Sequence, residues 1–151
     1  MTASGLDAFD TPIGLVDLAR ARGNAARVVA YAEDHGLAWR PHIKTHKSPR
    51  MARLQLDAGA RGLTVATLHE AEVMAEVTDD ILLAYPQIGE VRIARMAELV
   101  RSTEVDLKVA IDSEVALAAL GEVARRAGRP IGALVELDVG LRRVGVPTRE
   151  E

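Results

Sequence analysis

The chain has 151 residues, 48% hydrophobic and 27% charged, with a formal net charge of −3, the composition of an ordinary globular domain. It contains no cysteine, which excludes disulfide scaffolds and cysteine-based metal or redox sites. With no apolar run near the roughly 18 residues of a membrane span and no apparent signal peptide, the sequence predicts a cytoplasmic protein without a membrane partner.

The amino-terminal third predicts a lead-in, a strand, a helix and a second strand. Residues 1–11 are expected to be a lead-in, and the domain is expected to begin at residue 12. Residues 12–17 predict a short buried strand that ends in Asp17. Apolar residues at helical spacing follow, and Gly36 is a natural helix stop. Residues 37–44 predict the second strand, although Pro41 cannot donate to a sheet ladder.

The second predicted strand carries unusual chemistry for a buried element. Because strand side chains alternate, two sets are expected on opposite faces: Arg40, His42 and Lys44 on one, Trp39 and Ile43 on the other. Ser48 and Pro49 then predict a helix start, with a side-chain cap and a preset φ. Lys44 would therefore end a strand just before a loop and a helix, which is where α/β proteins place ligand chemistry.

Positive charge is concentrated around this stretch. Residues 38–53 contain five lysines and arginines and no acid, although the whole chain is acidic. A local basic window on an acidic protein predicts a binding site for a small anion such as phosphate or carboxylate. Proteins that bind nucleic acid are more often basic overall. With only 3% aromatic residues there is little on which bases could stack, so we expect no nucleic-acid partner.

The strand and helix pattern then repeats to the end of the chain. Strands are predicted at residues 62–66, 80–84, 105–111 and 131–138, with a helix before each of them. Thr67 and Glu70 fit a capping box, in which the glutamate reaches back to the helix start. Apolar residues occupy the odd positions of the last strand, and Glu136 and Asp138 share its other face.

Roughly six βα steps predict an α/β fold with parallel strands and right-handed crossovers. Two architectures fit, an open doubly wound sheet and a (β/α)8 TIM-type barrel. No glycine-rich phosphate loop follows a strand, which weakens the nucleotide-binding, doubly wound version. Polar residues end nearly every predicted strand, as at the top of a barrel: Asp17, Lys44, Thr67, Tyr85, Asp112 and Asp138. Since a barrel has eight steps in typically about 250 residues, we expect an incomplete barrel that is part of a larger protein.

Lys44 is the candidate nucleophile. A lysine amine is reactive when it is neutral, and burial or neighbouring cations favour the neutral form. Arg40, His42 and Lys47 are the expected neighbours. The alternative is a solvated lysine in a basic loop, and we expect Lys47 itself to be a surface or phosphate-facing charge.

Each of the other polar residues has a structural interpretation as well as a functional one. His42 and His46 are expected to be hydrogen-bonded histidines rather than metal ligands, because no carboxylate lies near them in sequence. Glu136 and Asp138 could form an acid/base pair, or an interior ion pair with the basic strand. Arg143, between two glycines that free the backbone, is a candidate anion or cofactor contact.

These motifs resemble the D-threonine aldolase and D-serine dehydratase family, which belongs to the alanine-racemase-like, fold-type III pyridoxal-phosphate enzymes. The resemblance is carried by Arg-Pro-His-Ile-Lys-Thr-His-Lys at residues 40–47 and by stretches at 10–12, 59–64, 70–72, 80–86 and 138–145. It implies a (β/α)8 barrel, of which residues 12–151 would form the amino-terminal portion, followed by a β-rich domain absent from this chain. It also implies a homodimer.

The resemblance implies roles for individual residues. Lys44 matches the lysine that forms a Schiff base with pyridoxal 5'-phosphate, and Arg143 matches an arginine beside the phenolic oxygen of the cofactor. His42 and Tyr85 are expected as further cofactor contacts. A divalent metal, Mn or Zn, is expected only in the whole protein, because the family's metal ligands lie in the second domain; no metal ligand is expected here.

The implied activity is that of a lyase on D-3-hydroxy amino acids. We favour a D-threonine aldolase, which yields glycine and acetaldehyde, over a D-serine dehydratase, which yields pyruvate and ammonia. A non-catalytic pyridoxal-phosphate carrier and a scaffold domain are alternatives of other classes. The 151-residue chain alone is expected to be inactive, because the implied phosphate loop comes late in the barrel.

Overall fold

The computed structural model describes residues 5–147; residues 1–4, the start of the predicted lead-in, and 148–151, the end of the predicted barrel portion, lie outside the described residues. The strands are β1 (Leu63–Val65), β2 (Asp80–Leu83), β3 (Asp106–Ile111) and β4 (Gly132–Val135). The helices are α1 (Leu18–Asp34), α2 (Pro49–Asp57), α3 (Leu68–Met74), α4 (Glu90–Ser102) and α5 (Glu114–Ala127), with the short 3₁₀ helix η2 at Ile43–Thr45.

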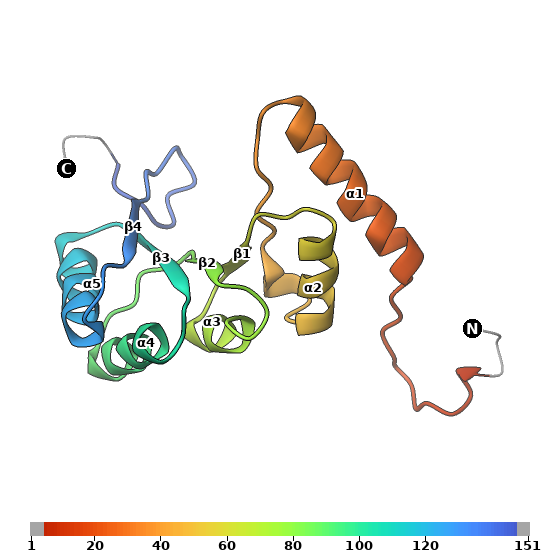
Figure 1. The fold of residues 1–151 in the computed structure, drawn as a ribbon, viewed down its shortest axis with the longest axis horizontal. Coiled ribbons are helices and arrows are strands. Elements are labelled where there is room, and N and C mark those ends of the chain that lie inside the picture. Colours follow the sequence, from red (N-terminus) through yellow and green to blue (C-terminus); the bar gives the residue numbers. More distant parts are fainter. Residues whose placement is uncertain (1–4, 148–151) are drawn as a thin grey trace.

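The four strands form one parallel sheet in the order β1-β2-β3-β4 (Figure 1). Helix α3 contacts β1 and β2, α5 contacts β3, and α4 packs between these helices against both, so the helices form a layer on one side of the sheet. Strands that neighbour each other in sequence order form the wall of a (β/α) barrel, whereas a doubly wound sheet reverses direction at a switch point. The predicted α/β class and partial parallel barrel are confirmed.

The core lies between this sheet and the helix layer. Its largest fully buried side chains include Leu63, Val65, Ile81, Leu83, Val109, Met74, Met96, Val100 and Val123. Full burial of such a side chain stabilises the fold by about 1.5–3 kcal/mol. The helices that complete the core begin at local caps, since the Ser48, Thr67 and Ser113 hydroxyls each accept an amide of the first turn. Gly128 ends α5 at φ 72°, a left-handed conformation that favours glycine.

The opposite face of the sheet carries a different set of side chains. Register pairs Thr64 with Leu82 and Leu82 with Lys108 across this face. Two residues further toward the carboxyl ends, and so on the same face, stand Ala66, Ala84 and Ala110. The inner face of this barrel wall is therefore lined by small side chains at the edge where the strands end.

Both amino-terminal strand predictions are wrong. Residues 12–17 form no strand, and Leu15 and Val16 are 63% and 61% exposed, because no neighbouring strand pairs with them within the described residues. Asp17 instead caps α1 by accepting the Arg20 amide at 3.0 Å. Residues 37–41 have no strand assignment, and only His42 bridges to Thr64, after which the chain turns into η2.

The last strand is shorter and more exposed than predicted. It covers Gly132–Val135 instead of residues 131–138. Val135 is 71% exposed, and within residues 5–147 β4 pairs with β3 alone. Leu137, beyond the end of β4, bridges to Val146 and is 41% exposed. The remaining strands and helices lie within a few residues of their predicted bounds. Within the described residues, no helix combines the length and apolar character needed to cross a membrane.

Candidate active site

Lys44 lies in η2, the turn that follows the segment beside β1. The segment is fixed by two backbone hydrogen bonds, from the Arg61 amide to the Trp39 carbonyl at 2.9 Å and from the Thr64 amide to the Pro41 carbonyl at 2.8 Å. Ile43 anchors the turn, since it is fully buried, while Lys44 next to it is exposed. Lys44 is therefore presented at the carboxyl edge of the sheet, as predicted, but from a turn rather than from a strand.

His42 caps this turn. Its Nδ1 accepts the Lys44 amide at 3.4 Å, a long contact, and its position beside Thr64 gives the bridge to β1. Burial lowers the pKa of His42, and the neighbouring Lys44 ammonium lowers it further, against the opposing effects of Glu70 and the Thr64 backbone. The ring is therefore neutral at pH 7, the form that can accept an amide hydrogen bond.

Arg40 does not lie beside Lys44, and this part of the prediction is wrong. Its Nη2 donates to Asp80 Oδ2 at 2.7 Å, at the amino end of β2. Lys108 Nζ donates to the other oxygen of Asp80 at 2.8 Å. Burial raises the pKa of Asp80, but these two cations outweigh it and hold the pKa below its ordinary value. Arg40 thus links its segment to β2 across β1. Because the Asp80 carboxylate lies at the amino end of β2, it draws the Arg40 side chain away from the carboxyl edge of the sheet.

Lys47, predicted to be a surface or phosphate-facing charge, is exposed at the surface and pairs with an acid. Its Nζ lies 3.0 Å from Glu70 Oε1, and its backbone adopts φ 50°. Glu70 is 6% exposed, so the contact is an ion pair between a buried carboxylate and an exposed ammonium. The Glu70 carboxylate also accepts the Ala66 amide at 2.8 Å, which confirms its predicted role at the start of α3.

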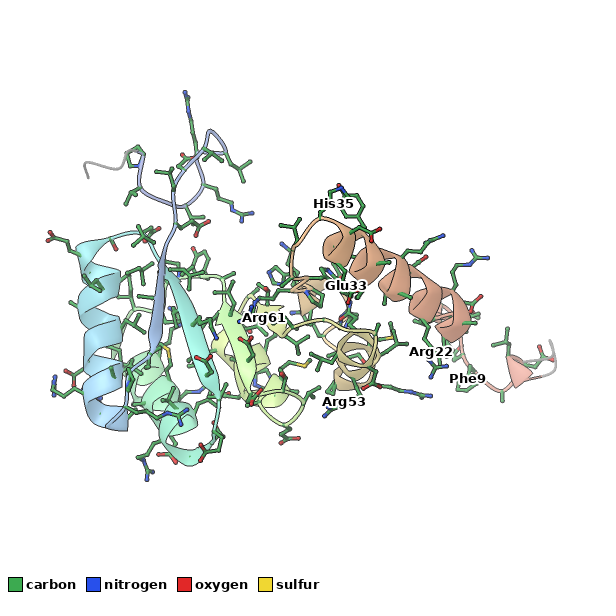
Figure 2. The ribbon with its side chains drawn as sticks, turned by 45° about the horizontal axis from the view of Figure 1, so that its top comes forward. Phe9, Arg22, Glu33, His35, Arg53 and Arg61 are labelled. Carbon is green, nitrogen blue, oxygen red and sulfur yellow. The ribbon has the colours of Figure 1, made fainter. Side chains whose placement is uncertain are left out.

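The basic window is dispersed by folding. Arg50 and Arg53 line a cavity of about 470 Å³ between α1 and α2, together with Arg22 and Asp57. Figure 2 shows Arg22 on α1 and Arg53 on α2, both to the side of the sheet. This cavity contains none of the predicted site residues. The five cations therefore do not form one anion site. Arg40 and Lys47 pair with different acids, and Arg50 and Arg53 lie together on α2.

His46 behaves as the predicted hydrogen-bonded histidine. Its Nδ1 accepts the Ser48 amide at 3.0 Å, and its Nε2 lies 3.3 Å from Gln55 Oε1. These contacts hold the turn between η2 and α2. Within residues 5–147, no group of three or more histidine and carboxylate side chains gathers in a way that could hold a metal ion.

Tyr85 lies just after β2 and is 53% exposed. It lines a cavity of about 400 Å³ with Ala66, Thr67 and His69, which follow β1. A smaller cavity of about 170 Å³ shares Thr67 and His69 and is bounded by Lys47 and Glu70. Tyr85 and Lys47 therefore belong to adjoining hollows at the ends of β1 and β2.

Arg143 is exposed in the loop after β4, at the other end of the strand order from Lys44. Asp138 forms this loop, because its Oδ1 accepts the Gly140 and Arg142 amides at 2.8 and 3.0 Å. These backbone hydrogen bonds are the main reason that the pKa of Asp138 is lowered. Of the two alternatives for Asp138, the ion pair with the basic strand is not found among the described residues, since its carboxylate is bound to its own loop.

The structure thus brings His42, Lys44, Lys47 and Glu70 together at one end of the carboxyl edge and places Arg143 at the other. No contact joins Lys44 to Arg143 or Tyr85 among the described residues. Sequence reasoning missed two carboxylates that orient the cations, Glu70 toward Lys47 and Asp80 toward Arg40. The sequence signal for these acids was the excess of cations at residues 38–53. Since that window contains no acid, any charged partner has to come from another part of the chain.

Three comparisons with known proteins bear on this site. The sequence model of the family described as alanine racemase, N-terminal domain, matches residues 16–151. D-threonine aldolase of Arthrobacter sp. is 36% identical over 138 residues, and D-threo-3-hydroxyaspartate dehydratase of Delftia sp. (strain HT23) is 38% identical over 139 residues. Each alignment covers 91% of this chain, and the chain spans 36% of the length of each relative. The crystal structure of D-threonine aldolase from Filomicrobium marinum superposes with a TM-score of 0.87 at 30% identity, covering 93% of this chain and 38% of that one.

Proposed function

Because this chain belongs to the alanine racemase N-terminal domain family, we propose that the whole protein is a pyridoxal-phosphate-dependent lyase of D-3-hydroxy amino acids. The observation that carries the proposal is the state of Lys44. The chain has three lysines, and Lys47 and Lys108 are each paired with a carboxylate. Lys44 is exposed at the edge where the parallel strands end. Among the described residues, no acid lies within ion-pair distance of its amine.

The residues of this edge fit the cofactor. Lys44 offers an amine for the cofactor aldehyde, and the alanines at the ends of β1, β2 and β3 leave room on the inner face. Arg143, on a loop held by Asp138, offers a guanidinium for an anionic oxygen. Pyridoxal phosphate, when bound, supplies an electron sink for negative charge that develops on the substrate Cα.

The residues of this chain have defined tasks in such a site. Lys44 Nζ would hold the cofactor through its aldehyde group and would be the amine of this edge that can accept or return a proton. His42, neutral and bound to the Lys44 amide, holds the turn that aims this side chain. Ile43 fixes the same turn from the core side. Preorganisation of this kind keeps the reacting nitrogen in place at each turnover.

Within this class we propose a D-threonine aldolase, which breaks Cα–Cβ and releases glycine and acetaldehyde. The relative named D-threonine aldolase supports this choice, whereas the relative named D-threo-3-hydroxyaspartate dehydratase keeps loss of the β-hydroxyl as the alternative. A D-serine dehydratase belongs to the same alternative. We further propose that the whole protein uses a divalent metal, with ligands outside the described residues, which would supply Lewis-acid chemistry to either route.

The test is to map the cofactor and assay turnover in the whole protein. Borohydride reduction of the cofactor-loaded protein should place the pyridoxyl group on Lys44, and Lys44→Ala should abolish cleavage of D-threonine. Lys44→Arg should do no better, because a guanidinium does not deprotonate in proteins. Release of pyruvate from D-serine without acetaldehyde from D-threonine would favour the dehydratase. Cofactor binding without turnover of either would indicate the carrier, and a group on Lys47 with Lys44 unmodified would overturn the assignment.

A further inference from the structure

Two lysines three residues apart stand at the same edge of the sheet. Lys44 and Lys47 are both exposed, Lys47 with 64% of its side chain accessible. Either amine could react with an aldehyde on grounds of access alone. What distinguishes them in the structure is a single acid, since Glu70 lies 3.0 Å from Lys47 Nζ and no acid of the described residues pairs with Lys44.

Hydrogen bonds that do not involve Lys47 hold the Glu70 side chain in position. It lies in the first turn of α3, where its amide donates to Thr67 Oγ1 at 3.1 Å and its Oε2 accepts the Ala66 amide at 2.8 Å. Burial raises the pKa of Glu70, but the Ala66 amide and Lys47 outweigh that effect and the pKa is lowered. The carboxylate is therefore charged at pH 7, and its other oxygen, Oε1, is buried and lies 3.0 Å from Lys47 Nζ.

The backbone also directs Lys47 toward this acid. Lys47 adopts φ 50°, which is uncommon for a residue with a Cβ. The left-handed conformation turns the chain between η2 and α2, and the Lys47 side chain lies against α3. The ion pair holds the Lys47 amine against a buried carboxylate, whereas no acid of the described residues holds the Lys44 amine.

We infer that Glu70 is a specificity-determining residue that withholds the Lys47 amine from aldehydes, so that Lys44 alone takes the cofactor. This inference rests on the proposed function for its biological meaning, but the difference in amine reactivity is a property of the chain itself. The chemistry concerned is condensation: the amine nitrogen adds to the aldehyde carbon, two N–H protons and the carbonyl oxygen leave as water, and a C=N bond forms. Glu70 acts on the first step, because an amine held in its ion pair must leave the carboxylate before it can reach an aldehyde carbon.

The experiment compares the acetylation rates of the two lysines under trace acetic anhydride in the whole protein without cofactor, by peptide mass mapping. In the parent protein Lys47 should react more slowly than Lys44, once each rate is divided by its rate in urea-unfolded protein. Glu70→Gln should raise the Lys47 rate about three- to tenfold and leave Lys44 unchanged. Glu72→Gln is the matched control, because Glu72 lies on the same helix but pairs with Arg95, and it should change neither rate.

A second measurement uses pyridoxal phosphate followed by borohydride. Glu70→Gln should move part of the pyridoxyl label to Lys47, whereas the parent and Glu72→Gln should carry it on Lys44. Equal normalised rates for Lys44 and Lys47 in the parent protein would overturn the inference, even if Glu70→Gln does not fold. If acetylation follows the expected pattern but neither lysine takes pyridoxal phosphate, the proposed function fails while the control of amine reactivity stands.

Discussion

Gly62 is a residue whose lack of a side chain shapes the edge of the sheet. It lies just before β1, where the Arg40 side chain crosses to Asp80. A Cβ at this position would lie 2.4 Å from Arg40 Nη1 and 2.5 Å from the Asp80 carbonyl oxygen. The carbonyl belongs to the backbone of a paired strand and cannot withdraw. The close crossing of Arg40 over the chain therefore depends on glycine.

Gly62→Ala should lower the free energy of unfolding of the whole protein by about 1–3 kcal/mol, because the added methyl group overpacks this crossing. The measurement is urea denaturation followed by circular dichroism. Gly121→Ala is the matched control, since Gly121 lies within α5 and its added Cβ meets nothing within 4 Å. That change should stabilise by about 0.5–1 kcal/mol through helix propensity. Equal effects of the two substitutions would contradict the packing argument.

Asp80 should make the stability depend on acid pH. Its folded pKa is lowered, so its contribution is fully present above the unfolded value near pH 4 and is lost as pH falls through the folded value. Asp80→Asn should cost about 1.5–3 kcal/mol at pH 7, because it removes hydrogen bonds to two charged groups. The cost should shrink at pH 3, because the carboxylate of the unfolded parent chain is largely protonated there and part of the advantage of the ionised folded form is lost.

Urea denaturation at the two pH values measures this difference. Asp106→Asn provides the control, because Asp106 also binds Lys108 but its side chain is 68% exposed. Its effect at pH 7 should stay within about 0.2–1 kcal/mol, as for exposed pairs. A cost for Asp80→Asn that is the same at pH 7 and pH 3 would show that charge is not its main contribution.

The candidate site was only partly predictable at the level of residues. The position of Lys44 at the edge of the sheet follows from the local order of strand, turn and capped helix, which the sequence displays. The partners of Arg40 and Lys47 do not follow, because Asp80 and Glu70 lie 40 and 23 positions further along and reach them only through the parallel register. Ion pairs between distant segments leave no periodic signal in sequence.

Helix starts are the elements that local chemistry defines best. Ser113 Oγ accepts the Ala116 amide at 3.2 Å, and α5 begins at the next residue. Ser113→Ala should therefore destabilise the whole protein by about 1 kcal/mol, since an orphan amide loses its acceptor. Ser113→Asp is the matched control, because aspartate caps as well as serine. Thermal unfolding should show a lower Tm for the alanine variant alone, and a loss in both would point to a different role of Ser113.

The sequence predicted the helices better than the strands, and the reason is physical. A helix satisfies its own backbone, so the caps at Ser48, Thr67 and Ser113 and the stop at Gly128 were sufficient to place it. A strand, in contrast, needs a neighbouring strand to pair its backbone N–H and C=O groups. Residues 12–17 have strand-like composition but no partner in the described structure, and β4 has a neighbour on one side only. Pairing, rather than composition, decided which segments became strands.

On the scale of the whole molecule, two flanks of the barrel wall are open. On one flank α1 contacts α2 and leaves Tyr31 63% exposed. On the other, β4 exposes Leu134 and Val135 on a strand that pairs only with β3 within residues 5–147 (Figure 1). An exposed edge with apolar side chains is a template for pairing with another chain.

The 151-residue chain, expressed as such, should therefore self-associate, and Val135→Lys should reduce this association by placing a charge on the edge strand. Val115→Lys is the matched control, because Val115 on α5 is similarly exposed, at 61% against 71%, but does not lie on a strand edge. Size-exclusion chromatography with light scattering measures the mass of each variant. A monomeric parent chain, or equal effects of the two lysines, would contradict this role of the β4 edge.

The consecutive strand order also has a consequence for the synthesis of the chain. Every strand of the sheet pairs with the next one in sequence, across a single intervening helix. Contacts between segments close in sequence have a low contact order and lose little loop-closure entropy when they form. Because a nascent chain leaves the ribosome with its amino end first, β1 and β2 can pair before β3 has been translated. The wall can then grow by one βα unit at a time, at the pace of translation, with each new strand meeting an edge that already exists.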